Sequence, residues 1–229
     1  MTITTIGFDA DDTLWHNEDG FRHVEERFVE LVSPHAGRGV DVAAGLSATE
    51  LANLRVYGYG VKAFGLSLIE AALTLSGGSV PSSVIGQLLG EIRDLLEAPV
   101  RVLPGVPEVL AAVSDTHRLV LITKGDLIHQ TRKITTSGLA HHFHDVEVVN
   151  EKDPETYASI LARLGVKPEE FCMVGNSVKS DVVPLLTIGA HAVHVPYPLT
   201  WALELTDASH LDYDELSSIS DFPTWLAAQ

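Results

Sequence analysis

The sequence predicts an α/β fold of three layers, in which helices cover both faces of a parallel sheet. Short apolar runs, each about the length of one strand, recur along the chain, and helical patterns separate most of them. This alternation is typical of parallel strands joined by right-handed crossovers. A long helical stretch after the first apolar run interrupts the alternation, which predicts an inserted helical domain.

The chain opens with "ITTIGF" at residues 3–8, a β-branched and aromatic run typical of a strand. Residues 16–99 then carry mostly helical patterns, broken by the hinge-like segment "SGGSVPSS" at 76–83. We expect residues 1–15 and 100–229 to form the core, and residues 16–99 to form a small α-helical cap domain over the strand ends.

The second part of the chain supplies the remaining helices and strands in turn. Helices are expected, in chain order, at 105–114, 126–137, 154–164 and 178–188. Strands are expected between and after them, at 118–122, 145–149, 171–175 and 190–195. Each of these strands is short and mostly apolar, and Gly125, Asn150 and Pro196 follow three of them as breakers.

The composition is that of an ordinary globular protein, with 45% hydrophobic and 20% charged residues in 229. The chain shows neither an apolar run of membrane-spanning length nor a secretory signal, so we expect a cytoplasmic protein. The formal net charge of -16 argues against nucleic acids and anionic membranes as partners, because both need a basic face. Cys172 lies in an apolar run and is expected to be a buried structural thiol. The oligomeric state stays open.

Polar side chains follow four of the predicted strands. They come one to three positions after separate apolar runs, and they are Asp9, Thr123, Lys152 and Asn176. The carboxyl ends of parallel strands meet at one edge of a sheet, where ligands bind. We therefore expect these four side chains to surround one site.

Asp9 and Asp11 lie in "FDADDTLW" (8–15), and in an extended segment they point to the same face. Two carboxylates on one face need a compensating charge, and Mg²⁺ commonly takes one or two carboxylates together with phosphate oxygens. We expect the neighbouring charge and partial burial to raise the pKa of Asp11, so that it carries a proton while the metal keeps Asp9 ionised. An anionic substrate would also need local cations to overcome the acidic net charge, such as a metal ion or lysines near the acidic cluster.

Four motifs in order resemble those of the haloacid dehalogenase (HAD) superfamily. They are "FDADDTL" at 8–14, "LITKGD" at 121–126, "NEKDP" at 150–154 and "VGNSVKSD" at 174–181. They match, in turn, D-x-D-x-T-L, a strand that ends in Ser or Thr, the motif lysine, and G-D-x(3,4)-D. The segment "LPGVPEVLAAV" at 103–113 is similar to the usual re-entry from the cap. The resemblance spans the predicted core and implies a Rossmann-like hydrolase with phosphatase activity.

The resemblance implies a role for each matching residue. Asp9 would attack the phosphorus of a small phosphorylated metabolite and form an aspartyl-phosphate. Asp11 would protonate the leaving alcohol and then activate the water that hydrolyses the intermediate. Thr123 would donate its hydroxyl to a phosphoryl oxygen, and Lys152 would neutralise the charge that grows in the transition state.

The implied cofactor is Mg²⁺, held by Asp9, by the backbone carbonyl of Asp11 and by Asn176, with Asp181 behind them. Asn176 stands where the family more often has Asp, so the site loses one negative ligand and should hold Mg²⁺ less tightly, although an amide oxygen still coordinates hard cations.

Two further departures concern substrate contacts. Asp12 replaces the commoner Gly and adds charge near the phosphate, and Lys124 replaces a small or amide residue beside Thr123. Both are candidates for substrate binding. In the predicted cap, Arg55 and Lys62 are further candidates, although packing between helices would explain their neighbours Tyr57 and Tyr59 equally well.

The acid at position 11 favours phosphate ester cleavage, because an alcohol leaving group needs a proton and a halide does not. A dehalogenase and a phosphomutase of the same superfamily are alternatives. So is a weak relative that binds phosphorylated ligands without turnover, which Asn176 and Lys124 suggest.

Two other interpretations fit less well. A receiver-type signalling module needs its acceptor Asp after the third strand, where this chain has Asn150 and Glu151, and it leaves no place for the insert. The tract "HHFH" at 141–144 is expected to be an ordinary loop, because consecutive histidines in a loop point in divergent directions.

Overall fold

The computed structural model describes residues 2–207 and 210–229. The chain divides into two compact units. Unit 1 runs to Glu18 and continues through Val100–Lys124 and Gln130–Gln229, and unit 2 consists of Asp19–Pro99 and Gly125–His129. Within the described ranges, no helix is both long and apolar enough to cross a bilayer.

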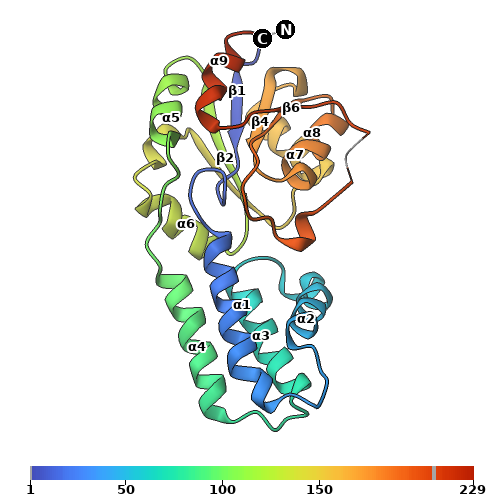
Figure 1. Cartoon of the computed structure of the whole chain (residues 1–229). Coiled ribbons are helices and arrows are strands. Elements are labelled where there is room, and N and C mark those ends of the chain that lie inside the picture. Colours follow the sequence, from blue (N-terminus) through green and yellow to red (C-terminus); the bar gives the residue numbers. More distant parts are fainter. Residues whose placement is uncertain (1, 208–209) are drawn as a thin grey trace. The chain divides into compact units, whose positions relative to one another are not determined.

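Unit 1 is built on a parallel sheet, so the predicted α/β class is confirmed (Figure 1). In the described part of the chain the sheet has six strands in the order β3-β2-β1-β4-β5-β6. Their bounds are β1 (Thr5–Phe8), β2 (Arg118–Lys124), β3 (Asp145–Val149), β4 (Phe171–Gly175), β5 (His191–His194) and β6 (Asp214–Glu215). Strands β2 and β3 follow β1 toward one edge of the sheet, and β4, β5 and β6 are added toward the other edge. The switch point therefore lies between β1 and β4, and parallel sheets of this kind bind their ligands at such a point.

The register aligns the carboxyl ends of the central strands. Phe8 at the end of β1 pairs with Leu121 of β2 and with Val174 of β4. The backbone N–H of Asp9 then donates to the Val174 carbonyl at 2.9 Å, which extends the pairing by one residue. The segments that follow β1 and β4 therefore leave the sheet side by side.

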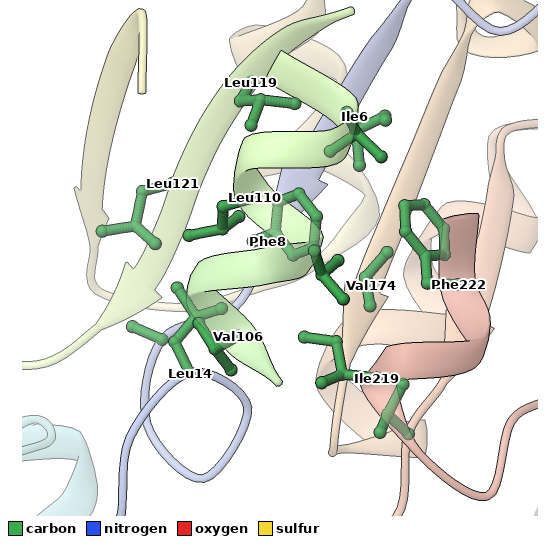
Figure 2. Close-up of a cluster of buried hydrophobic side chains, with 14 of the residues drawn as sticks. Ile6, Phe8, Leu14, Val106, Leu110, Leu119, Leu121, Val174, Ile219 and Phe222 are labelled. Atoms are coloured by element: carbon green, nitrogen blue, oxygen red, sulfur yellow. The ribbon is translucent and has the colours of Figure 1, made fainter. Parts of the chain in front are cut away.

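Alternate residues of the strands pack on opposite faces of the sheet. On one face, Phe8, Leu121 and Val174 lie in a cluster with Leu110 of α5 (Val106–Ser114) and Phe222 of α9 (Phe222–Leu226) (Figure 2). On the other face the cluster draws on α7 (Pro154–Leu164) and α8 (Val183–Thr187). Figure 1 shows α5 and α6 (Leu127–Thr136) on one side of the strands and α7 and α8 on the other. The core thus has the three predicted layers.

The segment 178–188, predicted as one helix, is divided in the structure. It forms one turn of π-helix, η4 (Val178–Val182), followed by α8. Pro184 at the start of α8 has no N–H, so a continuous i→i−4 ladder cannot form through it. The short 3₁₀ helices of the chain are η1 (Ser33–His35), η2 (Ala140–His142), η3 (Pro168–Glu170), η5 (Ala202–Glu204) and η6 (Ile219–Asp221).

Unit 2 is helical and has its own hydrophobic core. Its helices are α1 (Glu18–Val32), α2 (Val42–Tyr57), α3 (Val61–Leu75) and α4 (Ser82–Glu97). In α1, Val24, Phe28 and Val32 recur every fourth position and are buried in this core, as one face of an amphipathic helix requires. Leu68 of α3 and Leu88 of α4 complete its centre. The buried clusters of unit 1 contain none of these residues.

Unit 2 also buries a carboxyl group, which makes its stability depend on pH. Burial of Glu50 in α2, together with the charge of Glu25, raises the pKa of Glu50 from 4.5 to about 7. The folded state therefore binds this proton more tightly than the unfolded state does. The resulting stability is complete below pH 4.5 and is lost as the pH rises through 7.

We expect Glu50→Gln to stabilise the protein at pH 8, because the amide has no charge to bury. The gain in the free energy of unfolding should be on the order of 2 kcal/mol at pH 8 and should vanish near pH 4. Denaturant unfolding at both pH values measures it, with Glu97→Gln on the exposed end of α4 as the control. An equal effect at the two pH values would contradict the burial of a charge at Glu50.

Candidate active site

A buried lysine lies between two buried carboxylates at the carboxyl end of the sheet. Lys152, in the loop after β3, donates from Nζ to Asp9 Oδ1 at 2.5 Å and to Asp181 Oδ1 at 2.6 Å. All three side chains are almost completely inaccessible to solvent. One ammonium and two carboxylates leave a net negative charge in this triad, which a bound cation would compensate.

Burial and the charges within the triad shift the pKa values of Asp9 and Lys152. Burial raises the pKa of Asp9 to about 6, against the opposing effect of the Lys152 charge. Burial would lower the pKa of Lys152, but the Asp181 and Asp9 carboxylates outweigh it and hold that pKa well above its usual value. Lys152 is therefore a fixed cation, in contact with the residue predicted to be the nucleophile.

The Asp181 side chain can reach Lys152 because β4 ends in glycine. A Cβ on Gly175 would lie 2.2 Å from Asp181 Oδ2, so any larger residue would push the carboxylate away. That Oδ2 atom accepts from the backbone N–H of Ser177 at 3.1 Å. Both oxygens of Asp181 thus accept hydrogen bonds from the core, and its predicted place behind the metal ligands stays a prediction.

The other face of Asp9 meets Asn176 through an oxygen-rich cluster. Thr13 Oγ1 donates to Asp9 Oδ2 at 2.9 Å and accepts from the backbone N–H of Asn176 at 3.1 Å. One terminal atom of the Asn176 amide lies 3.2 Å from Asp9 Oδ2, from Thr13 Oγ1 and from the carbonyl oxygen of Asp11. With the amide nitrogen in that position, Asn176 can donate to these acceptors. Thr13 belongs to the motif at 8–14, but only the structure shows that its hydroxyl connects Asp9 to Asn176.

The residues of this cluster fit Mg²⁺. A carboxylate oxygen, a backbone carbonyl oxygen and a side-chain amide oxygen are hard donors, and Asp9, Asp11 and Asn176 would supply them once the Asn176 amide turns its oxygen toward the site. Over residues 2–207 and 210–229, no three His, Cys, Asp or Glu side chains are placed to hold a metal. A cation at this site would therefore depend on the carbonyl and the amide, and the unbalanced charge of the neighbouring triad favours one.

The Asp11 carboxylate turns toward helix α6. Its Oδ1 atom accepts from Lys133 Nζ and from Trp15 Nε1, both at 2.6 Å, and its Oδ2 atom accepts from Gln130 Nε2 at 2.9 Å. Burial alone would raise the pKa of Asp11, but the Lys133 charge and these hydrogen bonds together lower it. The expectation that Asp11 carries a proton is therefore wrong for this arrangement, because a cation that lies far away in the sequence compensates it.

Gln130 also connects Asp11 to the end of β2. Its Nε2 atom lies 2.9 Å from Thr123 Oγ1 and 2.7 Å from the Lys124 carbonyl. Thr123 is buried; its hydroxyl accepts from Gln130 and donates across a long contact of 3.4 Å to the Lys124 carbonyl. The sequence analysis missed Gln130 and Lys133, whose only local signal is that they lie three positions apart on one face of a helix.

In the structure the Asp12 side chain faces the start of α1, and its contact with substrate stays a prediction. The Asp12 φ of 63° is in the left-handed region, which glycine adopts more readily than other residues. Its carboxyl oxygens accept from the backbone N–H groups of Asn17 at 2.8 Å and Glu18 at 3.1 Å. Burial raises the pKa of Asp12 to about 8. The side chain therefore caps the start of α1.

The remaining predicted substrate contacts lie outside this cluster. Lys124 Nζ pairs with Glu204 Oε1 at 2.6 Å. Arg55 and Lys62 belong to unit 2, where Arg55 is exposed in the last turn of α2 and Lys62 Nζ pairs with Asp126 at 2.9 Å. For these residues a contact with substrate stays a prediction.

Comparisons with known proteins agree on one family. A family model described as haloacid dehalogenase-like hydrolase matches residues 3–189. The crystal structure of a haloacid dehalogenase-like family hydrolase from Xanthomonas campestris superposes with a TM-score of 0.89 and 39% identity, over 99% of this chain and 91% of that one. Both comparisons cover the strands and the turns that carry the cluster around Asp9.

Curated relatives are phosphatases. A glyceraldehyde 3-phosphate phosphatase from Methanopyrus kandleri is 25% identical over 193 residues, which is 79% of this chain and 78% of that protein. A phosphoserine phosphatase from Thermus thermophilus is 35% identical over 101 residues, which is 40% of this chain and only 41% of the relative. The second match thus spans less than half of the Thermus protein.

Proposed function

Because this chain belongs to the haloacid dehalogenase-like hydrolase family, we propose that it is a Mg²⁺-dependent phosphatase of small phosphomonoesters. The observation that carries the proposal is the placement of Asp9. Its carboxylate is buried, touches the fixed cation Lys152 and lies next to the amide of Asn176. The phosphatase names of the curated relatives support the same substrate class.

In the proposed first step, a carboxylate oxygen of Asp9 attacks phosphorus while the bond from phosphorus to the ester oxygen breaks. Lys152 and Thr13 already hold the two oxygens of Asp9 in one orientation, so little reorganisation is needed. The ammonium of Lys152 neutralises charge that grows on the phosphoryl group. The Thr123 hydroxyl accepts from Gln130 and donates only across a long 3.4 Å contact, so its proton can be redirected to a phosphoryl oxygen.

Mg²⁺, held by Asp9, the Asp11 carbonyl and Asn176, would supply further positive charge to the phosphoryl oxygens. Asn176 in place of an acidic residue leaves these ligands one negative charge short. The Lys152–Asp181 pair lies beside the ligands and contributes no net charge. We therefore expect weak Mg²⁺ binding that rises when a carboxylate replaces the amide.

Asp11 is proposed to move the protons. As an anion paired with Lys133 it is suited to take a proton from the water that cleaves the aspartyl-phosphate, which releases inorganic phosphate and restores Asp9. The leaving alkoxide of the first step also needs a proton. For Asp11 to supply that proton, its carboxyl group has to carry it in the substrate complex and be released from Lys133.

We also propose that residues 16–99 serve as the cap domain that selects the substrate. The chain leaves the core at Glu18, only a few residues after Asp11, and returns at Val100. Arg55 and Lys62 would then be the basic groups of the cap available to an anionic substrate. The insertion point next to the candidate nucleophile supports this role, because movement of such a domain would control access to the site.

The proposal predicts phosphate release that depends on Mg²⁺. We expect the purified protein to hydrolyse a generic aryl phosphate slowly and at least one of phosphoserine and glyceraldehyde 3-phosphate faster. Chelation should reduce release to background, and added Mg²⁺ should restore it. Asn176→Asp should lower the Mg²⁺ concentration for half-maximal rate about tenfold, since it adds a charged ligand. Halide release from a 2-haloacid without metal, in place of phosphate release, would instead support the dehalogenase alternative.

A further inference from the structure

We infer that Glu204 is a positioning residue of the active site, which fixes the end of β2 to the turn after β4. As far as it concerns turnover, this inference rests on the proposed phosphatase function. Glu204 is the last residue of η5, in the segment that follows β5. The match to the family model ends at residue 189, before this segment.

The Glu204 carboxylate is held by three side chains. Oε1 accepts from Lys124 Nζ at 2.6 Å. Oε2 accepts from Ser177 Oγ at 2.5 Å and from Ser180 Oγ at 2.6 Å. The side chains of Glu204 and Lys124 are only 14% and 13% exposed, so solvent screens this ion pair weakly. Burial would raise the pKa of Glu204, but Lys124 and the two hydroxyls outweigh it and lower the pKa to about 2.

Each of these partners is the neighbour of a candidate site residue. Lys124 follows Thr123 on β2, Ser177 follows Asn176, and Ser180 precedes Asp181. Ser180 Oγ also accepts from Lys124 Nζ at 2.9 Å, so the lysine contacts both the acid and the turn. A single carboxylate thus ties together the two segments that place Thr123, Asn176 and Asp181.

Loss of Glu204 would loosen both segments. Lys124 would keep its contacts with Ser180 Oγ at 2.9 Å and with Glu151 at 3.5 Å, but it would lose its ion pair with Glu204, and two largely buried hydroxyls would lose their acceptor. Buried donors left without an acceptor favour rearrangement of the segment that carries them. Glu204 is therefore expected to act on turnover through the geometry of its neighbours and not through contact with substrate. The same contacts make Lys124 part of this network, and its contact with substrate stays a prediction.

The test compares Glu204→Ala and Glu204→Gln with Asp212→Asn, an exposed acid in the same C-terminal segment. We expect Glu204→Ala to lower kcat for the best phosphomonoester at least about tenfold, with KM changed less than about threefold. Glu204→Gln keeps an acceptor for Lys124 and should recover most of the loss. In hydrogen exchange, peptides that cover 119–126 and 174–182 should exchange about tenfold faster in Glu204→Ala, and Asp212→Asn should match the wild type in every measurement.

Several results would overturn the inference. Unchanged exchange in both peptides would do so, whatever the activity, since the segments would then not depend on Glu204. A rise in KM with constant kcat would show a substrate contact in place of positioning. If the wild type released no phosphate, the proposed function would fail, while the exchange comparison would still decide whether Glu204 holds the two segments. If Glu204→Ala did not fold, Glu204→Gln would carry both measurements, with a smaller increase expected in the same two peptides.

Discussion

Asp9→Asn is expected to abolish phosphate release, with a loss of about 10⁴-fold or more in kcat. The amide cannot form the acyl phosphate through which the proposed reaction proceeds. The fold should survive, because Lys152 keeps its contact with Asp181 at 2.6 Å. Release of inorganic phosphate measures the loss, and acid quenching during turnover should trap a phosphorylated wild-type protein and an unmodified variant.

Asp12→Asn is the matched control for this prediction. Asp12 lies three positions away, and its carboxyl group faces the backbone N–H groups of Asn17 and Glu18 instead of the cluster around Asp9. Its raised pKa of about 8 means that it is largely uncharged at neutral pH, so an amide should replace it with little change. Turnover that persists in Asp9→Asn, or a phosphorylated form of that variant, would remove Asp9 as the nucleophile.

Lys152→Met is expected to have the largest effect on stability. It removes the ammonium that lies within 2.6 Å of two buried carboxylates and leaves Asp9 and Asp181 uncompensated. The loss of one partner from such a buried group costs about 3–5 kcal/mol in the free energy of unfolding. Denaturant unfolding at pH 7 measures this cost, and the variant should also lose turnover.

The double variant Lys152→Met with Asp181→Asn separates charge from packing. It removes the charge of one of the two buried carboxylates that lose their cation, so it should recover a substantial part of the stability that the single variant loses. Turnover should not recover. Lys179→Met, at an exposed lysine of the same π-turn, is the control and should stay close to the wild type. If Lys152→Met were as stable as the wild type, the triad could not be the buried, charge-compensated group that the structure shows.

The architecture was largely predictable, because the features that determine it are local in the chain. The runs at 145–149 and 171–175 were expected as strands and have these bounds in the structure. The two-residue strand β6 was not predicted, since Asp214–Glu215 is too short and too polar to show a pattern. The interruption at Pro184 was missed as well, although proline is a visible signal.

Some residues of the candidate site were also predictable from the sequence, and others were not. Asp9, Lys152 and Asn176 were singled out because each follows an apolar run, and the structure brings them within hydrogen-bonding distance of one another or of a shared partner. Their chemical roles stay predictions. Lys133 and Glu204 were not singled out, because nothing near them in the sequence distinguishes them from other charged residues.

By itself, the sequence determined the fold class and the residues that follow the central strands, since apolar runs and their stops are set by neighbouring residues. Only the tertiary structure decided the charge around those residues. Asp11 is paired with Lys133, which is 122 positions away, and Lys124 with Glu204, which is 80 positions away. Coulomb interactions depend on distance in space, so the lowered pKa of Asp11 appears only when α6 brings Lys133 beside it.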